Sequence, residues 1–526
     1  MLNSCSGGGS GDNSSSSAAT PLPIPVSTGV FLDSPVAGIR YSTATESGLT
    51  NSAGEFSYRA GETVTFQIGD ITLGAAAAAT VVTPLDLVGA SSLDEARQLG
   101  VFTRLVNTIL LLQSLDLDVN PTNGLDLSGL DEQISNSNLD LNLSNEAFIQ
   151  GNYRKLINKI GGQYVQPRRA INHLLDSLNE STTVSLLTSQ RLDSDGDGNT
   201  DRTTTFDYNE QGQLTTITTD LGGRSTITYS TDGQIASISD SPPNSLSVTT
   251  ERFEYDELGR LISQSQSQTQ AQTQEELVLR ETTYQYDSVG NVVETRQQSF
   301  TFNPFPSTSI SLYFTEFQLL FGLEFGVAFP SLRPDLSDSI TRAGTDLIFD
   351  NAGLVPVSPT NDVLEFVTNY QYLEDGTISE IRRTGLINAT TTFNSAMNCY
   401  EVESGSPITV ITPGISHNPA FVSTIVADIN GIGICGNNQS VLRDSRGRVV
   451  EIQYSTQSKT SFNFDGELLV SLETVDIRET EPDTISRTEF SYNSFNDMIL
   501  RAGFIDGVLQ ASLTREYERR VLGSLP

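Results

Sequence analysis

FEYDELGRL, residues 253–261, is the stretch of sequence that decides the fold. Phe253 and Tyr255 alternate, which places two rings on one face of a β-strand, and the final leucine resumes that face after a turn. Asp256 suits the first position of a type I turn, and Gly259 suits the left-handed residue that closes a hairpin. The stretch therefore predicts one β-hairpin.

Variants of this hairpin recur along the second half of the chain. In one of them Asn496 replaces the glycine, and asparagine is the residue that best tolerates the same left-handed conformation. An ordinary β-sandwich with glycine-containing hairpins is the alternative to a repeat array. The variants are Tyr208–Leu214, Tyr229–Ile235, Tyr286–Val292, Tyr372–Ile378, Arg443–Val449, the shortened Phe464–Leu468, and Tyr492–Met498.

These hairpins resemble the YD repeats of the bacterial Rhs family. The resemblance covers residues 202–296, 366–385 and 440–519, and it rests on both the frame and the spacing of the motif. It implies that the hairpins line up into a long, curling antiparallel sheet. We therefore expect residues 186–526 to form a YD-repeat-like β domain, with inserts at 297–365 and 386–439.

The composition indicates a secreted, soluble, β-rich chain of two or three domains. The chain has 526 residues and a formal net charge of −34, and it contains no tryptophan. This charge argues against nucleic acid as a partner, because phosphate backbones are bound by clustered Lys and Arg. No stretch of about 18 uncharged apolar residues is present to form a membrane helix.

The first 27 residues predict a lipid anchor and a flexible tether. Leu2-Asn3-Ser4-Cys5, followed by a Gly/Ser-rich run, resembles the processing site of a bacterial lipoprotein, with Cys5 as the lipidated residue. We expect a signal peptide upstream of Met1, and Ser6 implies the outer membrane, at the cell surface or facing the periplasm. A lone cysteine in a disordered tail is the alternative.

A β module and a helical region follow the tether. Residues 28–90 contain short strands split by turns, and their order is similar to the prealbumin-like (carboxypeptidase regulatory-like) modules, which act as spacers. Residues 91–185 predict helices, beginning with a capping-box pattern at Ser92 and an apolar helical stripe over 96–115. A second helical stripe covers 145–178, with a break at Gly161-Gly162. The overall prediction is a mainly β chain with a small helical region.

The sharpest chemical motif lies between the helices and the first repeat. Oxygen-bearing side chains alternate around Gly198, which is the arrangement of a calcium loop. Position twelve of an EF-hand would be Thr204, so the loop looks more similar to the Asp-rich loops of thrombospondin type 3 repeats. A plain acidic linker is the alternative to a weak structural Ca²⁺ site. The predicted ligands are Asp193, Asp195, Asp197 and Asp201 through their side chains, and Asn199 through its carbonyl.

A looser version of this pattern spans Asp116–Asp126. It could supply a second calcium site, although an Asn/Asp-rich turn is the simpler interpretation.

The three cysteines fit an oxidising compartment. Cys399 and Cys435 lie in the second insert, and a disulfide between them would leave Cys5 free for a lipid thioether. Two unpaired buried thiols are the alternative.

Two segments of the repeat region have unusual patterns. Residues 315–329 alternate apolar and other residues, which predicts a long strand with one buried face, whereas a membrane-inserted hairpin has the same pattern. Ser263–Thr273 is a Ser/Gln-rich run, and we expect a mobile hairpin arm there.

Catalysis finds little support in the sequence. The chain has two histidines, His173 and His417, and no HExxH, Walker or Gly-x-Ser-x-Gly motif. We therefore expect a non-catalytic envelope lipoprotein that acts as a surface scaffold or adhesion protein, with carbohydrate or another envelope protein as its ligand. Membrane contact is expected only through the lipid, and the sequence specifies no oligomeric state. A glycan hydrolase that uses exposed carboxylates is the alternative.

Overall fold

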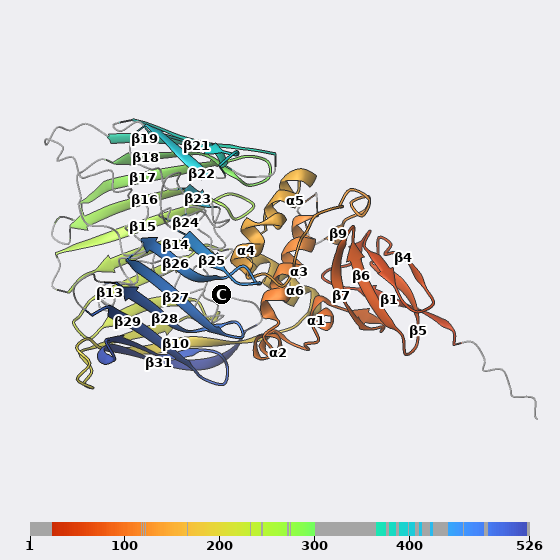
Figure 1. Ribbon diagram of the computed structural model, residues 1–526, viewed down its shortest axis with the longest axis horizontal. Coiled ribbons are helices and arrows are strands. Elements are labelled where there is room, and N and C mark those ends of the chain that lie inside the picture. Colours follow the sequence, from red (N-terminus) through yellow and green to blue (C-terminus); the bar gives the residue numbers. More distant parts are fainter. Residues whose placement is uncertain are drawn as a thin grey trace, which may run out of the picture.

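The chain forms three parts in sequence order, a β module, a helical segment and a closed sheet (Figure 1). The mainly β class predicted from the sequence is confirmed. The computed structural model describes residues 24–522 except 117, 119, 121–122, 166, 232, 244–245, 271–272, 274, 300–363, 375–377, 386–388, 398, 405–409, 413–420, 424–439, 456 and 478–481.

The β module consists of two small sheets with strand orders β5-β1-β8 and β4-β3-β6-β7. Period-2 alternation in β6 buries every second side chain, including Phe66, whose ring packs 4.5 Å from Phe31 and edge-on to Phe56 at 5.2 Å. The strands are β1 (Val26–Phe31), β2 (Val36–Ala37), β3 (Arg40–Ser42), β4 (Ser47–Leu49), β5 (Glu55–Arg59), β6 (Thr63–Ile68), β7 (Ile71–Ala77) and β8 (Val81–Val82).

The helical segment joins the β module to the closed sheet (Figure 1). Its elements are α1 (Pro84–Leu87), α2 (Leu93–Gln98), α3 (Phe102–Ser114), β9 (Leu125–Asp126), α4 (Asn145–Gln150), α5 (Asn152–Ile160) and α6 (Pro167–Leu178). Among the described residues, no helix has the length and apolar character that a membrane crossing requires.

Two local features of the helices differ from the predicted pattern. Gly100 is left-handed, with φ of +68°, and it divides the expected 96–115 helix into α2 and α3. Ser92 caps α2 by accepting a hydrogen bond from Glu95 N at 3.2 Å. The Glu95 carboxylate, however, accepts from Ser91 N at 2.7 Å and not from the cap residue itself.

One hydrophobic core runs from the β module through the helices to the closed sheet. It contains Phe66 of β6, Ile109 of α3, Leu174 of α6, and Leu186 and Leu522 of the strands that close the sheet. Because these side chains bury one another, the three parts pack as one continuous body.

The closed sheet is antiparallel and runs from β10 to β22 and from β25 to β31. It closes on itself because β31 pairs with β10 along Thr182–Asp193. The resemblance implied a curling sheet, and this closure removes its free edges. The strands are β10 (Thr182–Asp193), β11 (Arg202–Tyr208), β12 (Leu214–Thr219), β13 (Arg224–Tyr229), β14 (Ile235–Ser241), β15 (Ser247–Tyr255), β16 (Leu261–Gln270), β17 (Glu276–Tyr286), β18 (Val292–Ser299), β19 (Leu364–Tyr372), β20 (Ile378–Gly385), β21 (Ala389–Asn394), β22 (Cys399–Ser404), β25 (Ser440–Arg443), β26 (Val449–Ser455), β27 (Ser458–Asp465), β28 (Leu468–Asp476), β29 (Thr484–Tyr492), β30 (Met498–Ile505) and β31 (Val508–Leu522).

Parts of the expected inserts belong to this sheet. β21 and β22 fall inside the predicted 386–439 insert, yet they continue the sheet, and β23 (Val410–Thr412) and β24 (Phe421–Ser423) form a separate hairpin. The Ser/Gln-rich run is also different from the predicted mobile arm, because residues 263–270 belong to strand β16 of the closed sheet, which pairs with β15 and β17. Gln264 and Gln266 are buried there, and the Gln264 amide donates to Glu251 at 2.5 Å.

Most of the repeat turns are closed by an aspartate or asparagine, and the Tyr229 repeat is closed by Ser230. Asp256 Oδ1 accepts hydrogen bonds from Leu258 N at 3.0 Å and Arg260 N at 2.8 Å. Gly259 has φ of +78°, and Asn496 adopts the same left-handed conformation at +66°, as the sequence predicts. The acid of the YD motif therefore has a structural role in capping its own turn.

The tyrosine of the motif links several of the repeats to their neighbours. Its ring is part-buried against the inner face, and its hydroxyl donates to the carbonyl oxygen of a residue in the preceding hairpin at 2.7–2.9 Å, which phenylalanine could not do. The pairs are Tyr208 with Leu187, Tyr229 with Leu214, Tyr286 with Leu261, Tyr372 with Val292, Tyr492 with Leu469, and Tyr517 with Met498.

Successive turns of an antiparallel sheet alternate between the two ends of its strands. The repeat turns lie at the end that faces the helices, which we call the helical end, and the remaining turns lie at the distal end (Figure 1). Backbone groups of the helical segment bond directly to the turns. Tyr164 N donates to Val289 O at 3.2 Å, and Ser144 N donates to Arg446 O at 2.7 Å.

A buried ion pair docks α2 beside the line where the sheet closes. The Arg97 guanidinium of α2 lies 3.5 Å from the Asp497 carboxylate in the β29–β30 turn, and both side chains are buried. Asp497 also accepts from Ser185 Oγ of β10 at 2.7 Å. Asp94 of α2 pairs with Arg519 of β31, so α2 contacts both closing strands.

Candidate metal centre

The loop at residues 193–201 joins β10 to β11 at the distal end of the closed sheet. Asp193 is the last residue of β10 and is buried, whereas Asp195 and Asp197 are exposed in the loop. Gly196 packs so closely on the start of β31 that a Cβ there would lie 2.7 Å from the Leu509 carbonyl oxygen. The loop therefore has one buried anchor and an open outer side.

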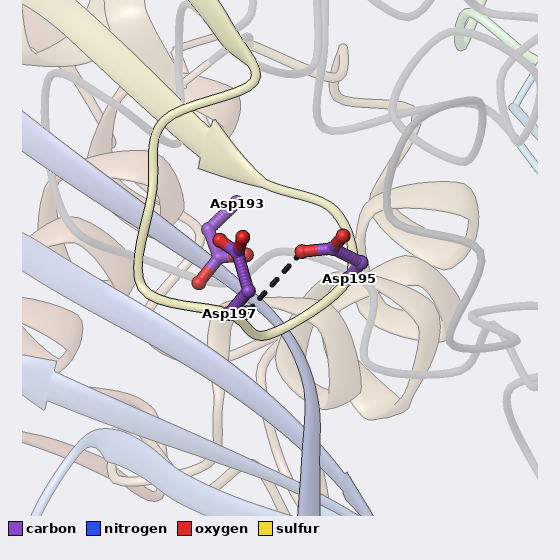
Figure 2. Close-up of side chains that lie close together, drawn as sticks. All are labelled: Asp193, Asp195 and Asp197. Carbon is purple, nitrogen blue, oxygen red and sulfur yellow. Dashed lines mark hydrogen bonds between the residues drawn. The ribbon is translucent and has the colours of Figure 1, made fainter.

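Three of the predicted ligands converge at this point. One carboxylate oxygen from each of Asp193, Asp195 and Asp197 lies within 4.8 Å of the other two. Figure 2 shows their carboxylates grouped inside the curve of the loop, with Asp197 N donating to Asp195 Oδ1 at 3.2 Å. Within the described ranges, this is the one place where three such side chains come together around one point.

Backbone amides hold the buried member of the cluster in place. Gly196 N donates to Asp193 Oδ1 at 2.7 Å, and Gly198 N donates to Asp193 Oδ2 at 3.0 Å. Both glycines are left-handed, with φ of +75° and +87°. The sequence predicted a sharp turn at Gly198, and the structure adds a second left-handed glycine at Gly196.

The side chains of the other two predicted ligands make hydrogen bonds within the loop. Asp201 Oδ2 accepts from Ser194 N at 2.7 Å and Ser194 Oγ at 2.5 Å, and these bonds hold the pKa of Asp201 below its usual value. Asn199 Nδ2 donates to Asp197 Oδ2 at 2.8 Å. Asp201 thus closes the base of the loop by accepting hydrogen bonds from Ser194. The sequence did not predict this contact.

The donor set of the cluster suits calcium. Calcium binds oxygen ligands at about 2.3–2.6 Å, so ligands on opposite sides of one ion are about 5 Å apart. The three carboxylate oxygens lie within such a span of one another. Each carboxylate oxygen keeps a lone pair after accepting one hydrogen bond, so the amide contacts leave room for coordination.

The remaining predicted site residues cannot be placed in the same way. Cys5, Cys435 and residues 315–329 lie outside the described residues, and Cys399 begins β22 with its side chain outside them.

A buried acid between the β module and the helices was not predicted. Asp33 has no exposed surface, and its carboxylate accepts from Gln113 Nε2 at 3.2 Å and lies 3.8 Å from His173 Nε2. Burial raises the pKa of Asp33 to about 7, despite the opposing Gln113 bond, and burial lowers the pKa of His173. Asp33 stands before Ser34-Pro35, a sequence that indicates only a turn.

Comparison with known proteins assigns no family. No family model matches the chain, and no curated protein matches it. Solved structures with some similarity include TcdB2-TccC3-Cdc42, at 15% identity and a TM-score of 0.24 over 70% of this chain and 18% of that one. The Photorhabdus luminescens Tc holotoxin pore (mutation TccC3-D651A) aligns at 15% identity and 0.24 over 58% of this chain and 14% of that one.

A third structure is a porin-like protein from Bacteroides uniformis ATCC 8492. It aligns at 10% identity and a TM-score of 0.21 over 64% of this chain and 98% of that one. The chain spans less than a fifth of the length of the first two structures, and TM-scores this low carry no argument about fold or function.

Proposed function

We propose that this protein is a non-catalytic lipoprotein of the bacterial outer membrane that presents the closed sheet as a surface scaffold or binding platform. The observation that carries the proposal is the continuous packing of the β module, the helical segment and the closed sheet around one core. The described chain begins at the end of the molecule farthest from the closed sheet (Figure 1). An anchor at Cys5 would therefore hold the sheet away from the membrane.

The lipid anchor is tested by metabolic labelling. With a leader added upstream, the full chain should incorporate palmitate and partition into detergent, and Cys5→Ser should abolish both. Labelling that survives Cys5→Ser would remove the lipoprotein proposal. The same periplasmic material should contain a Cys399–Cys435 disulfide, and two alkylatable thiols in native protein would contradict that pairing.

The binding role is tested with carbohydrate. Polar side chains and ion pairs such as Arg191–Glu516 and Arg296–Glu365, each at 2.9 Å, lie on the exposed parts of the sheet and support a soluble binding surface. We expect the full chain to retain glycans or purified envelope protein without changing them. Release of shortened sugars would instead identify a glycan hydrolase and overturn the non-catalytic proposal.

Calcium at the 193–201 loop is the second part of the proposal. Three clustered carboxylates repel one another, and a bound cation would remove that repulsion and stabilise the folded state. Millimolar calcium should raise the melting temperature and protect the segment 190–205 from proteolysis. Magnesium should do less, because it gives up its water reluctantly.

The matched variants separate calcium binding from net charge. Asp195→Ala with Asp197→Ala should remove the proteolytic protection, whereas Asp207→Ala with Glu254→Ala removes the same charge from exposed strand positions and should leave it intact. Equal protection in the two double variants would show that the 193–201 loop is only an acidic linker.

A further inference from the structure

The loop between α3 and β9 contains a buried carboxylate that is only half satisfied. Asp116 is 2% exposed. Its Oδ1 accepts a hydrogen bond from Asp126 N at 3.1 Å, which closes the base of the loop. Its Oδ2 is buried and accepts no hydrogen bond in the described part of the chain. A buried charged oxygen without a partner is costly, so the site requires a further positive group.

A second carboxyl group, that of Asp118, lies beside Asp116 and cannot donate a hydrogen bond when it is ionised. Burial, together with the carboxyl of Asp118 beside it, raises the pKa of Asp116 to about 6, against the bond from Asp126 N that lowers it. Asp118 is itself oriented by Asn120 N at 2.9 Å and Asn123 Nδ2 at 2.8 Å. Two ionised carboxylates cannot donate to each other, so either a proton or a cation must lie between them.

The surroundings favour a cation over a proton. Helix α3 ends at Ser114, so the negative end of its dipole points toward Asp116. The Asp126 carboxylate adds further negative potential to both Asp116 and Asp118. A proton neutralises one charge, whereas a divalent ion neutralises two and can bind both carboxylates at once.

We propose that the 116–126 loop holds one divalent cation of the calcium class between Asp116 Oδ2 and the Asp118 carboxylate. Water and other oxygen ligands would complete its shell, because only two carboxylates take part. The ion would tie the end of α3 to β9, which pairs with β2 of the β module. This second site is separate from the 193–201 loop and independent of the scaffold proposal.

Calcium stoichiometry in the full chain tests the proposal. In the Asp195→Ala, Asp197→Ala background, calorimetric titration with calcium chloride should still find one ion per chain. Adding Asp118→Asn should abolish that binding, and since Asp118 is exposed, the substitution leaves the core untouched. Asp140→Asn is the matched control, because Asp140 also accepts from the backbone two residues on, at 2.8 Å, and lies outside the loop.

The two outcomes are distinct. Loss of the remaining ion with Asp118→Asn, but not with Asp140→Asn, supports a cation between Asp116 and Asp118. A background variant that binds no calcium, or one whose binding is unchanged by Asp118→Asn, overturns the proposal. In that case the carboxyl pair shares a proton, and Asp116→Asn should raise the melting temperature at pH 7.5 with no response to calcium.

Discussion

Replacing Arg97 by alanine should destabilise the docking of α2 on the closed sheet far more than the loss of an ordinary surface ion pair. The Asp497 carboxylate has no exposed surface, and the Arg97 guanidinium 3.5 Å away is its cationic partner. Arg97→Ala leaves this carboxylate buried with the hydroxyl of Ser185 at 2.7 Å and the amide of Asn493 at 3.0 Å as neutral donors.

The expected magnitude follows from this burial. Removing one partner of a buried pair costs about 3–5 kcal/mol, because an uncompensated charge remains in a medium of low polarity. The two neutral donors place Arg97→Ala near the lower end, about 3 kcal/mol. The double variant Arg97→Ala, Asp497→Asn should cost less than Arg97→Ala alone, since its buried side chain carries no charge.

Urea unfolding followed by circular dichroism measures this difference, and it suits a chain that contains no tryptophan. The control is Arg191→Ala, because Arg191 and Glu516 are about half exposed, and such a pair contributes about 0–1 kcal/mol. If Arg97→Ala costs no more than Arg191→Ala, or if Asp497→Asn brings no recovery, the buried pair does not hold α2 on the sheet.

Three further substitutions test the repeats and the buried acid. Tyr286→Phe should cost about 1 kcal/mol in urea unfolding, because it deletes the hydrogen bond to Leu261 O and keeps the ring; no change would exclude a role for the hydroxyl. Gly259→Ala should cost about 1–2 kcal/mol at φ of +78°, whereas Asn496→Gly should be nearly neutral, and equal costs would argue against left-handed strain. The raised pKa of Asp33 means that its favourable contribution is present below about pH 4 and is lost as the pH rises through about 7. Asp33→Asn should therefore raise the melting temperature at pH 8 and lose that advantage by about pH 4, and a constant difference would contradict the shift.

The repeat hairpins were predictable because local chemistry and strand pattern agree in them. Alternating rings, a capping acid and a left-handed residue recur within nine positions, and each has its effect inside one hairpin. Closure of the sheet was not predictable in this way, since it depends on β10 and β31, which are more than three hundred residues apart. The Ser/Gln-rich strand β16 was missed because its composition resembles a linker, while its neighbours bury Gln264.

In the acidic loop, too, the local features were predictable and the contacts set by the folded chain were not. Alternate aspartates indicated a cation site, and three of them do converge, because a tight glycine turn is a local feature. The sequence did not separate Asp201 from that set, since its partner Ser194 is identified only by the way the loop closes. The burial of Asp33 and Asp116 also depends on helices that arrive from elsewhere in the chain.

The residue after the left-handed glycine or asparagine of the turn differs between repeats, and in some repeats it contacts a docked helix. In several repeats it is a long side chain that reaches the next turn, as when Gln234 Nε2 donates to Gly259 O at 2.8 Å or Arg260 lies 4.6 Å from the Tyr286 ring. Asn291 and Asp497 hold this position in two turns where its side chain bonds to a helix, to Arg154 of α5 at 2.7 Å and to Arg97 of α2. A short polar side chain at this position reaches the docking helix. At these two positions, a departure from the repeat coincides with a contact to a helix outside the repeat.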